Sequence, residues 1–136
     1  MNMAAEWLKA AYLDVENIHY IVKVEHLTSI TAFHAQQSIE KSFKALVQNK
    51  YGKVNKQHDL LKLYSLISDS FTVQNSDMLD TLNNLYTDSR YPGDIGLLPY
   101  GKPTLKDAKE FYEFARDIFN QVCTLLNISM DEIKAH

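Results

Sequence analysis

Two lysines on one predicted helix carry the first chemical signal in the chain. Lys41 and Lys44 are three positions apart, so a helix presents both on one face, where they can hold a phosphate together. The alternative is a solvated helix face on which Glu40 forms an ion pair with Lys44 at four-residue spacing. Such a pair contributes about 0.3–0.5 kcal/mol. The sequence leaves both interpretations open.

A second signal is the tripeptide Arg90-Tyr91-Pro92, where a helical pattern ends because proline keeps the preceding residue out of the helical region. The guanidinium of Arg90 is a planar, permanently charged fork that suits a phosphate or a carboxylate. One hypothesis is that Arg90 and Tyr91 contact an anion in a cleft between helices. The other is that Arg90 pairs with a buried acid, Asp14 or Glu40, and pins the loop to the fold.

The dipeptide His58-Asp59 also has two interpretations. Asp59 suits the N-cap of a helix, where a carboxylate accepts from free backbone N–H groups and meets the positive helix end. His58 is a candidate ligand-binding residue or general base. The alternative is a capping and packing role for the pair.

A helical wheel of the segment 29–50 sorts its polar residues by face. Gln36 falls beside the apolar arc and Glu40 falls at its edge. Gln37, Lys41 and Lys44 fall on the polar side, where all three are candidate ligand-binding residues. We expect Gln36 to form a structural hydrogen bond to a neighbouring helix, since an unpaired buried amide costs on the order of 1–3 kcal/mol.

The sequence carries no pattern for metal or cofactor chemistry. Cys123 is the only cysteine, which excludes an intrachain disulfide and a cysteine-based zinc site. Its place at the margin of an apolar stripe predicts a small core residue rather than a nucleophile. His19, His26 and His34 are scattered, and no Gly-rich phosphate loop or Ser elbow occurs. We therefore expect neither a metal nor a cofactor.

The elements that must position these residues are helices. Apolar residues recur every three or four positions in five segments, which are 4–24, 29–50, 59–68, 76–87 and 104–127. Thr28 or Ser29, and Asn75 or Ser76, are predicted N-caps of the second and fourth segments. Gly52 is a predicted C-terminal glycine. The segment 89–103 is a predicted loop, and 129–136 adds one turn or frays.

Length, composition and charge indicate a single all-α domain. Its 136 residues fit one domain, with a core of about 4–127 and a tail of 128–136. The pattern predicts an all-α, antiparallel up-and-down bundle of four to five helices. The formal charge of −3 excludes a whole-protein positive field for nonspecific nucleic-acid binding. The lone cysteine and the lack of a signal peptide or a membrane-spanning run favour the cytoplasm.

Several motifs in order resemble one family, the HEPN domains (higher eukaryotes and prokaryotes nucleotide-binding). The segment 33–46, with its double Gln, its Glu-Lys pair and its Lys-Ala-Leu, resembles the family's second-helix signature. His58-Asp59-Leu60 is similar to the His-Asp-Leu that opens the third helix. Arg90-Tyr91-Pro92 is similar to the Arg-Tyr-Pro that follows the fourth. Trp7 and Asp14 in the first helix also fit, so the resemblance spans about residues 4–127.

The resemblance implies a four- or five-helix bundle, frequently a homodimer. It also implies a test for ribonuclease activity in the sequence. Many HEPN members are ribonucleases that use an arginine followed, after four to six residues, by a histidine. Neither Arg90 nor Arg116 is followed by such a histidine, so ribonuclease activity by the family mechanism is not expected. Other members are partners of nucleotidyltransferase-like proteins, some of them in toxin–antitoxin pairs, and some bind nucleotides.

Three functions therefore remain for the chain. The first is a binding module for a nucleotide, an RNA end or a nucleotidyltransferase-like protein, dimeric and without the ribonuclease mechanism. The second is a divergent ribonuclease with a displaced catalytic set, for instance Arg90 with His58. The third is a structural or regulatory bundle that acts by dimerising through exposed apolar residues. The first is the interpretation that we prefer.

Overall fold

The computed structural model describes residues 2–54, 56–87 and 101–135, and Arg90 and Tyr91 lie outside these ranges. The described part contains no β-strand, which confirms the predicted all-α class. Its elements are α1 (Met3–Ile21), the 3₁₀ helix η1 (Glu25–Leu27), α2 (Thr28–Tyr51), α3 (Leu60–Ile67), α4 (Ser76–Thr87), α5 (Leu105–Leu125) and α6 (Met130–Lys134). The sixth helix is the extra turn of the tail, and Ser129 caps it by accepting from the Glu132 N–H.

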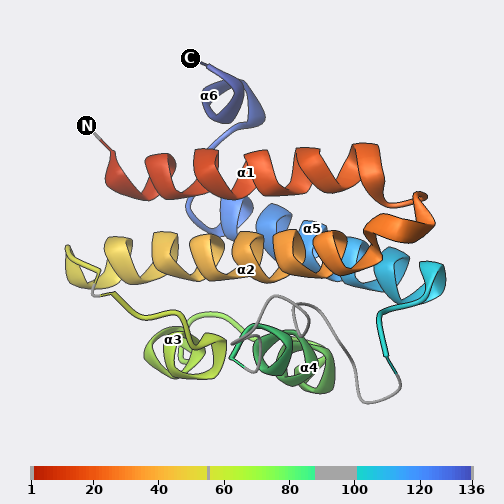
Figure 1. Cartoon of the computed structure of the whole chain (residues 1–136). Coiled ribbons are helices and arrows are strands. Elements are labelled where there is room, and N and C mark those ends of the chain that lie inside the picture. Colours follow the sequence, from red (N-terminus) through yellow and green to blue (C-terminus); the bar gives the residue numbers. More distant parts are fainter. Residues whose placement is uncertain (1, 55, 88–100, 136) are drawn as a thin grey trace.

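Helix α2 lies at the centre of the fold and contacts α1, α3, α4 and α5 (Figure 1). Helices α1 and α2 form an antiparallel pair, and α5 runs antiparallel to α1. Helices α3 and α4 lie on the side of α2 that is turned away from α1, and α6 packs on α1. A helix that is covered on so many sides buries polar as well as apolar residues. Several of the predicted site residues on α2 are therefore buried.

One core gathers apolar side chains from all six α-helices. Its largest fully buried aromatic residues are Phe43 of α2 and Phe119 of α5. Phe43 stacks on Tyr64 of α3 with ring centroids 5.9 Å apart, so aromatic packing joins α2 to α3.

Among the helices that the structure describes, none combines the length and the apolar character that a membrane span requires.

Most predicted helix ends are confirmed by their caps. Gly52 ends α2 in the left-handed conformation with φ of 75°, which glycine adopts without a Cβ penalty. The Asp59 carboxylate caps α3 and the Asn75 side chain accepts from the Met78 N–H at the start of α4. At α5, Thr104 and Asp107 form a reciprocal capping box.

The predicted cap of α2 is wrong. The helix begins at Thr28 itself, its N-cap position is Leu27, and no side chain caps it. The reason is that η1 leads directly into α2, so helical conformation starts before Thr28. Thr28 is buried instead, at 1% exposure.

Candidate functional site

The carboxylate of Glu40 is the centre of a polar cluster between α2 and the start of α3. Its Oε2 accepts from the Lys44 Nζ at 3.1 Å and lies 3.1 Å from the His58 Nδ1. Its Oε1 accepts from the Gln36 Nε2 at 3.3 Å. The Lys44 ammonium also lies 5.2 Å from the centre of the Trp7 ring, a cation–π contact from α1. We call these five residues the Glu40 cluster.

Burial changes the meaning of the Glu40–Lys44 ion pair. One of the two interpretations placed the pair on a solvated face, but Glu40 is 4% exposed and Lys44 is 5% exposed. The wheel was wrong for Lys44 because neighbouring elements, Trp7 among them, cover that side of α2. Two charges removed from water need good partners, since breaking a buried pair costs about 3–5 kcal/mol. In this structure the Lys44 ammonium therefore neutralises Glu40 in the interior and is not exposed to a ligand.

The two glutamines link this cluster to the surface of α2. Gln36 is buried, and its Nε2 makes a long contact of 3.5 Å with the carbonyl of His58. The predicted partner on a neighbouring helix is thus replaced by the backbone just before α3. The Gln37 Nε2 donates to the Gln36 Oε1 at 2.7 Å, so the orientation of one amide fixes the other.

A second cluster joins α2 to α1 through the carboxylate of Asp14. The Asp14 Oδ2 accepts from the Lys41 Nζ at 2.7 Å, and the Oδ1 lies 2.8 Å from the His34 Nδ1. Asp14 is buried, whereas the side chains of His34 and Lys41 stay about a quarter exposed. Lys41 and Lys44 therefore bind different carboxylates, and the shared phosphate clamp that their spacing suggested is not preformed.

The Asp59 carboxylate supports the predicted capping role. Its Oδ1 accepts from the N–H groups of Leu61 and Lys62 and from the Asn83 Nδ2 of α4. His58, next to it, keeps 55% of its side chain exposed while its Nδ1 faces Glu40.

The predicted contacts of Arg90 and Tyr91 lie outside the described residues. The carboxylates of Asp14 and Glu40, proposed as partners of Arg90, each have a lysine partner already.

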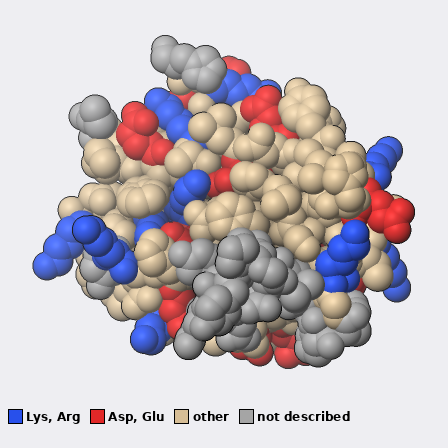
Figure 2. All heavy atoms as spheres, in the orientation of Figure 1, with Lys and Arg blue, Asp and Glu red and all other residues tan. Residues whose placement is uncertain are grey.

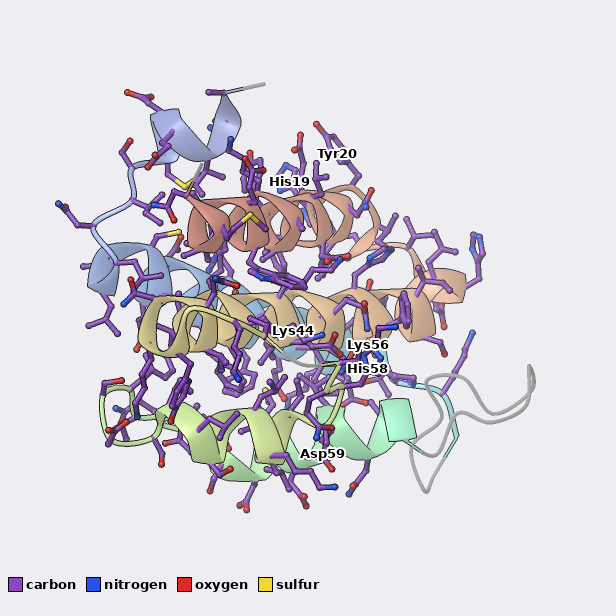
Figure 3. The ribbon with its side chains drawn as sticks, turned by 90° about the vertical axis from the view of Figure 1, so that its left-hand side faces the viewer. His19, Tyr20, Lys44, Lys56, His58 and Asp59 are labelled. Atoms are coloured by element: carbon purple, nitrogen blue, oxygen red, sulfur yellow. The ribbon has the colours of Figure 1, made fainter. Side chains whose placement is uncertain are left out.

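The part-exposed polar side chains of α2 share one face. His34, Gln37 and Lys41 recur at spacings of three and four, so their side chains are neighbours on the helix surface. His58 adjoins this face through its contacts with Gln36 and Glu40. Figure 3 shows Lys44 on α2 and His58 between α2 and the layer formed by α3 and α4. We call His34, Gln37, Lys41 and His58 the α2 polar strip.

A group of cations that the sequence analysis did not single out lies elsewhere, between α1 and α5. Lys23, Lys106, Lys109 and Arg116 line a hollow of about 830 Å³ there. The three α5 cations recur at positions 106, 109 and 116, and this helical spacing was the signal in the sequence. Figure 2 shows basic and acidic side chains interspersed over the face in view.

The remaining sequence candidate is Cys123, which is buried in the core as predicted. Burial raises the pKa of its thiol to about 11, because the thiolate would lose its hydration. Within the described ranges no three His, Cys, Asp or Glu residues converge on a point where they could hold a metal ion.

Comparison with known proteins gives one result that covers nearly the whole chain. The HEPN domain family model matches residues 3–126. No curated protein and no solved structure gives a match. The match runs from the first residue of α1 into the end of α5, so it includes both polar clusters of α2. The all-helical fold and this match agree, and the chain belongs to the HEPN domain family.

Proposed function

We propose that this chain binds a phosphate-bearing ligand, a nucleotide or an RNA end, on the α2 polar strip, and that it does not cleave RNA by the family's arginine–histidine mechanism. The observation that carries the proposal is that side chains with exposed nitrogen groups lie on one face of α2 and, in the case of His58, next to it. Lys41 supplies an ammonium, Gln37 an amide, and His34 and His58 imidazoles. These are the donor types that bind phosphate oxygens through charge-assisted hydrogen bonds.

The two buried carboxylates hold these donors in place. The Asp14 carboxylate holds Lys41 and His34 by direct contacts. The Glu40 carboxylate holds His58 and the Gln36 amide, and the Gln36 Oε1 in turn accepts a hydrogen bond from the Gln37 Nε2. Donors that are already oriented lose less conformational entropy when a ligand arrives. A phosphate would share Lys41 with Asp14, so the expected affinity is moderate and depends on salt.

The proposal excludes only one catalytic route. The pattern of arginine, four to six residues and histidine is missing after both Arg90 and Arg116. A displaced catalytic set of Arg90 and His58 stays a hypothesis, because a general base must reach its proton within hydrogen-bond distance. Incubation of end-labelled RNA with wild type and His58→Ala tests it, and cleavage that disappears with His58→Ala would establish the divergent ribonuclease.

Thermal melting with and without ligand tests the binding proposal. Nucleoside mono-, di- and triphosphates and 5′- or 3′-phosphorylated oligoribonucleotides are added to the whole chain. A ligand at a hundredfold excess over its Kd stabilises the folded state by about 2.7 kcal/mol. We expect a rise in melting temperature with at least one phosphorylated ligand and none with its unphosphorylated counterpart.

Paired variants make this test specific to the strip. Asp14→Asn with Lys41→Met removes the Lys41 ammonium without leaving a buried charge unpaired, and we expect it to abolish the ligand-induced shift. The matched control is Lys50→Met with Asp69→Asn, an exposed pair at 2.8 Å at the end of α2. Absence of a shift with every phosphorylated ligand in the wild type contradicts the proposal.

A second candidate function is that of a partner for a nucleotidyltransferase-like protein, in a toxin–antitoxin pair or another assembly. The cations between α1 and α5, which form no ion pair with any described residue, favour a protein-binding role of this kind. Co-expression with a nucleotidyltransferase encoded beside this chain, followed by size-exclusion chromatography, tests it. Separate elution of the two proteins would count against the partnership.

A further inference from the structure

Three hollows adjoin one another along the side of α1 that faces α5 and α6. The first, of about 830 Å³, lies at the carboxyl end of α1. The second, of about 350 Å³, shares His19, Tyr112 and Arg116 with the first. The third, of about 370 Å³, shares Tyr12 and Glu16 with the second and reaches α6. Because each hollow shares lining residues with the next, we call the three together the α1 trough.

The α1 trough has the length of a short helix. Its lining runs from Lys9 on α1 to Lys23 just beyond the end of that helix, a distance of roughly 20 Å at a rise of 1.5 Å per residue. Figure 3 shows His19 and Tyr20 of this lining on α1, away from Lys44 and His58. The trough is thus distinct from the α2 polar strip, and its occupant does not depend on the phosphate ligand proposed there.

Charge in the trough opposes the charge of the whole chain. Four cations, Lys23, Lys106, Lys109 and Arg116, line the first hollow together with one carboxylate, Glu113. As far as the structure describes the chain, these four cations form no ion pair, in contrast to Lys41 and Lys44. A cationic surface on a chain of formal charge −3 indicates an anionic partner.

The aromatic residues of the trough favour a protein over a nucleic acid. The Lys134 ammonium lies 5.9 Å from the centre of the Tyr12 ring, and the Arg116 guanidinium lies 5.1 Å from that of Tyr112. These ring faces are already occupied by cations, so they are less suited to stacking on bases. Apolar surface remains available instead, because Leu13 is 58% exposed and Leu105 is 41% exposed. An apolar floor with a cationic rim suits an amphipathic helix.

We propose that the α1 trough binds an acidic amphipathic helix of about four turns from a partner protein. Apolar residues of that helix, at spacings of three and four, would cover Val22, Leu105 and Leu13. Its carboxylates would pair with Lys106 and Lys109 on α5 and with Lys23 beyond the end of α1. Burial of the apolar face supplies the affinity, and the charges set the orientation and raise the association rate.

Selection from a library of random 16-residue peptides displayed on phage tests the proposal with the whole chain as target. We expect enrichment of peptides that combine carboxylates with apolar residues at helical spacing. An enriched peptide, made with a fluorophore, is then titrated by anisotropy. Lys106→Glu with Lys109→Glu should weaken its binding at least tenfold. The same peptide with its glutamates changed to lysines should bind this variant more tightly than it binds the wild type.

Matched controls separate the trough from general electrostatics. Lys53→Glu with Lys62→Glu reverses two exposed charges outside the trough and should leave peptide binding unchanged. Circular dichroism and melting confirm that both double variants are folded. A failure to enrich acidic amphipathic peptides overturns the proposal, as does equal weakening by the control variant.

Two further results would assign the trough to another occupant and overturn the proposal. One is a twelve-residue oligouridylate that binds with the same dependence on Lys106 and Lys109 and displaces the peptide, which would make the trough a nucleic-acid site. The other is a change in sedimentation from dimer to monomer in the Lys106→Glu, Lys109→Glu variant without added peptide. That result would identify a second copy of the chain as the occupant.

Discussion

Glu40 is the residue on which the polar interior of α2 depends. Its carboxylate faces one cation, one imidazole and one amide, although the side chain is nearly inaccessible to water. Its three partners satisfy the hydrogen-bonding capacity of the buried carboxylate. If Glu40 were removed, the Lys44 ammonium would remain buried without a counter-charge, so the main effect of Glu40 on stability is to neutralise that charge.

We predict that Glu40→Gln destabilises the fold by about 3–5 kcal/mol, because it leaves the Lys44 ammonium buried without a counter-charge. Replacing both residues, as Glu40→Gln with Lys44→Met, should recover much of this loss. Urea denaturation of the four proteins of the double-mutant cycle measures the coupling. Glu25→Gln, an exposed glutamate in η1, is the control. Additive effects of the two substitutions would contradict the prediction.

Cys123 gives a prediction about reactivity. Because burial raises the pKa of its thiol to about 11, almost no thiolate is present at pH 8 in the folded protein. We expect slow alkylation by iodoacetamide at pH 8, an increase as the pH approaches 11, and fast alkylation at pH 8 in denaturing urea. Mass spectrometry of timed samples measures the rate. Equal rates with and without urea would show that Cys123 is accessible.

The residue types of the site could be predicted from the sequence, but their pairing could not. A wheel that treats α2 as an isolated cylinder assigns Lys44 to the polar side. It does not include Trp7 of α1, which covers that side and lies at least twenty-one positions from every α2 residue. The sequence marked Asp14 as a structural polar residue and a candidate partner of Arg90, but its contacts with His34 and Lys41 depend on how α1 packs on α2.

At the scale of elements, the junction of α3 and α4 depends on two hydrogen bonds made by one side chain, that of Asn83. The Asn83 Oδ1 accepts from the Leu60 N–H at 2.8 Å, and its Nδ2 donates to the Asp59 carboxylate at 3.2 Å. Asn83 is 4% exposed and belongs to α4, so one buried amide completes the cap of another helix. This contact orients α3 and, with it, His58.

We predict that Asn83→Ala costs about 1–3 kcal/mol, because it leaves the buried Leu60 N–H without its acceptor. Asp80→Ala, at an exposed position of the same helix, is the matched control and should have little effect. Urea denaturation gives the stability, and hydrogen exchange should show faster exchange in α3. Protection of α3 equal to that of wild type would contradict the proposed junction.

Helix positions were predictable where a local signal marks the end. Gly52, Asp59 and Thr104 each satisfy backbone groups of their own helix, and these ends were predicted correctly. The start of α2 was not, because η1 replaces the side-chain cap and a three-residue 3₁₀ helix leaves little trace in the sequence. The role of Asn83 was missed for another reason, since it caps a helix that begins twenty-three positions before it.

At the scale of the whole molecule, exposed apolar residues next to the α2 polar strip indicate an interface. Ile30 and Phe33 of α2 are 41% and 40% exposed, and the Phe33 ring makes an edge contact with His34 at 5.5 Å. Homodimers are common among HEPN domains. We propose that two copies associate through this end of α2, which would bring their polar strips together.

We predict that the wild type sediments as a dimer and that Ile30→Glu with Phe33→Glu sediments as a monomer, because two charges would have to be buried in the interface. Sedimentation velocity at several protein concentrations measures the state. Leu61→Glu, at an equally exposed leucine of α3, is the control and should remain dimeric. A wild type that stays monomeric at every concentration would exclude this interface.

The central place of α2 has a consequence for synthesis on the ribosome. The α1–α2 hairpin is translated before α5, which covers a large part of α2 and begins more than fifty residues after α2 ends. Until then the part of α2 that α5 covers stays exposed, although α1, α3 and α4 can already pack on the helix, and exposed apolar surface of a nascent chain is a target for chaperones and for aggregation. The core is therefore completed only after α5 has been translated, and a premature stop codon before Leu105 would yield a product that cannot close its core.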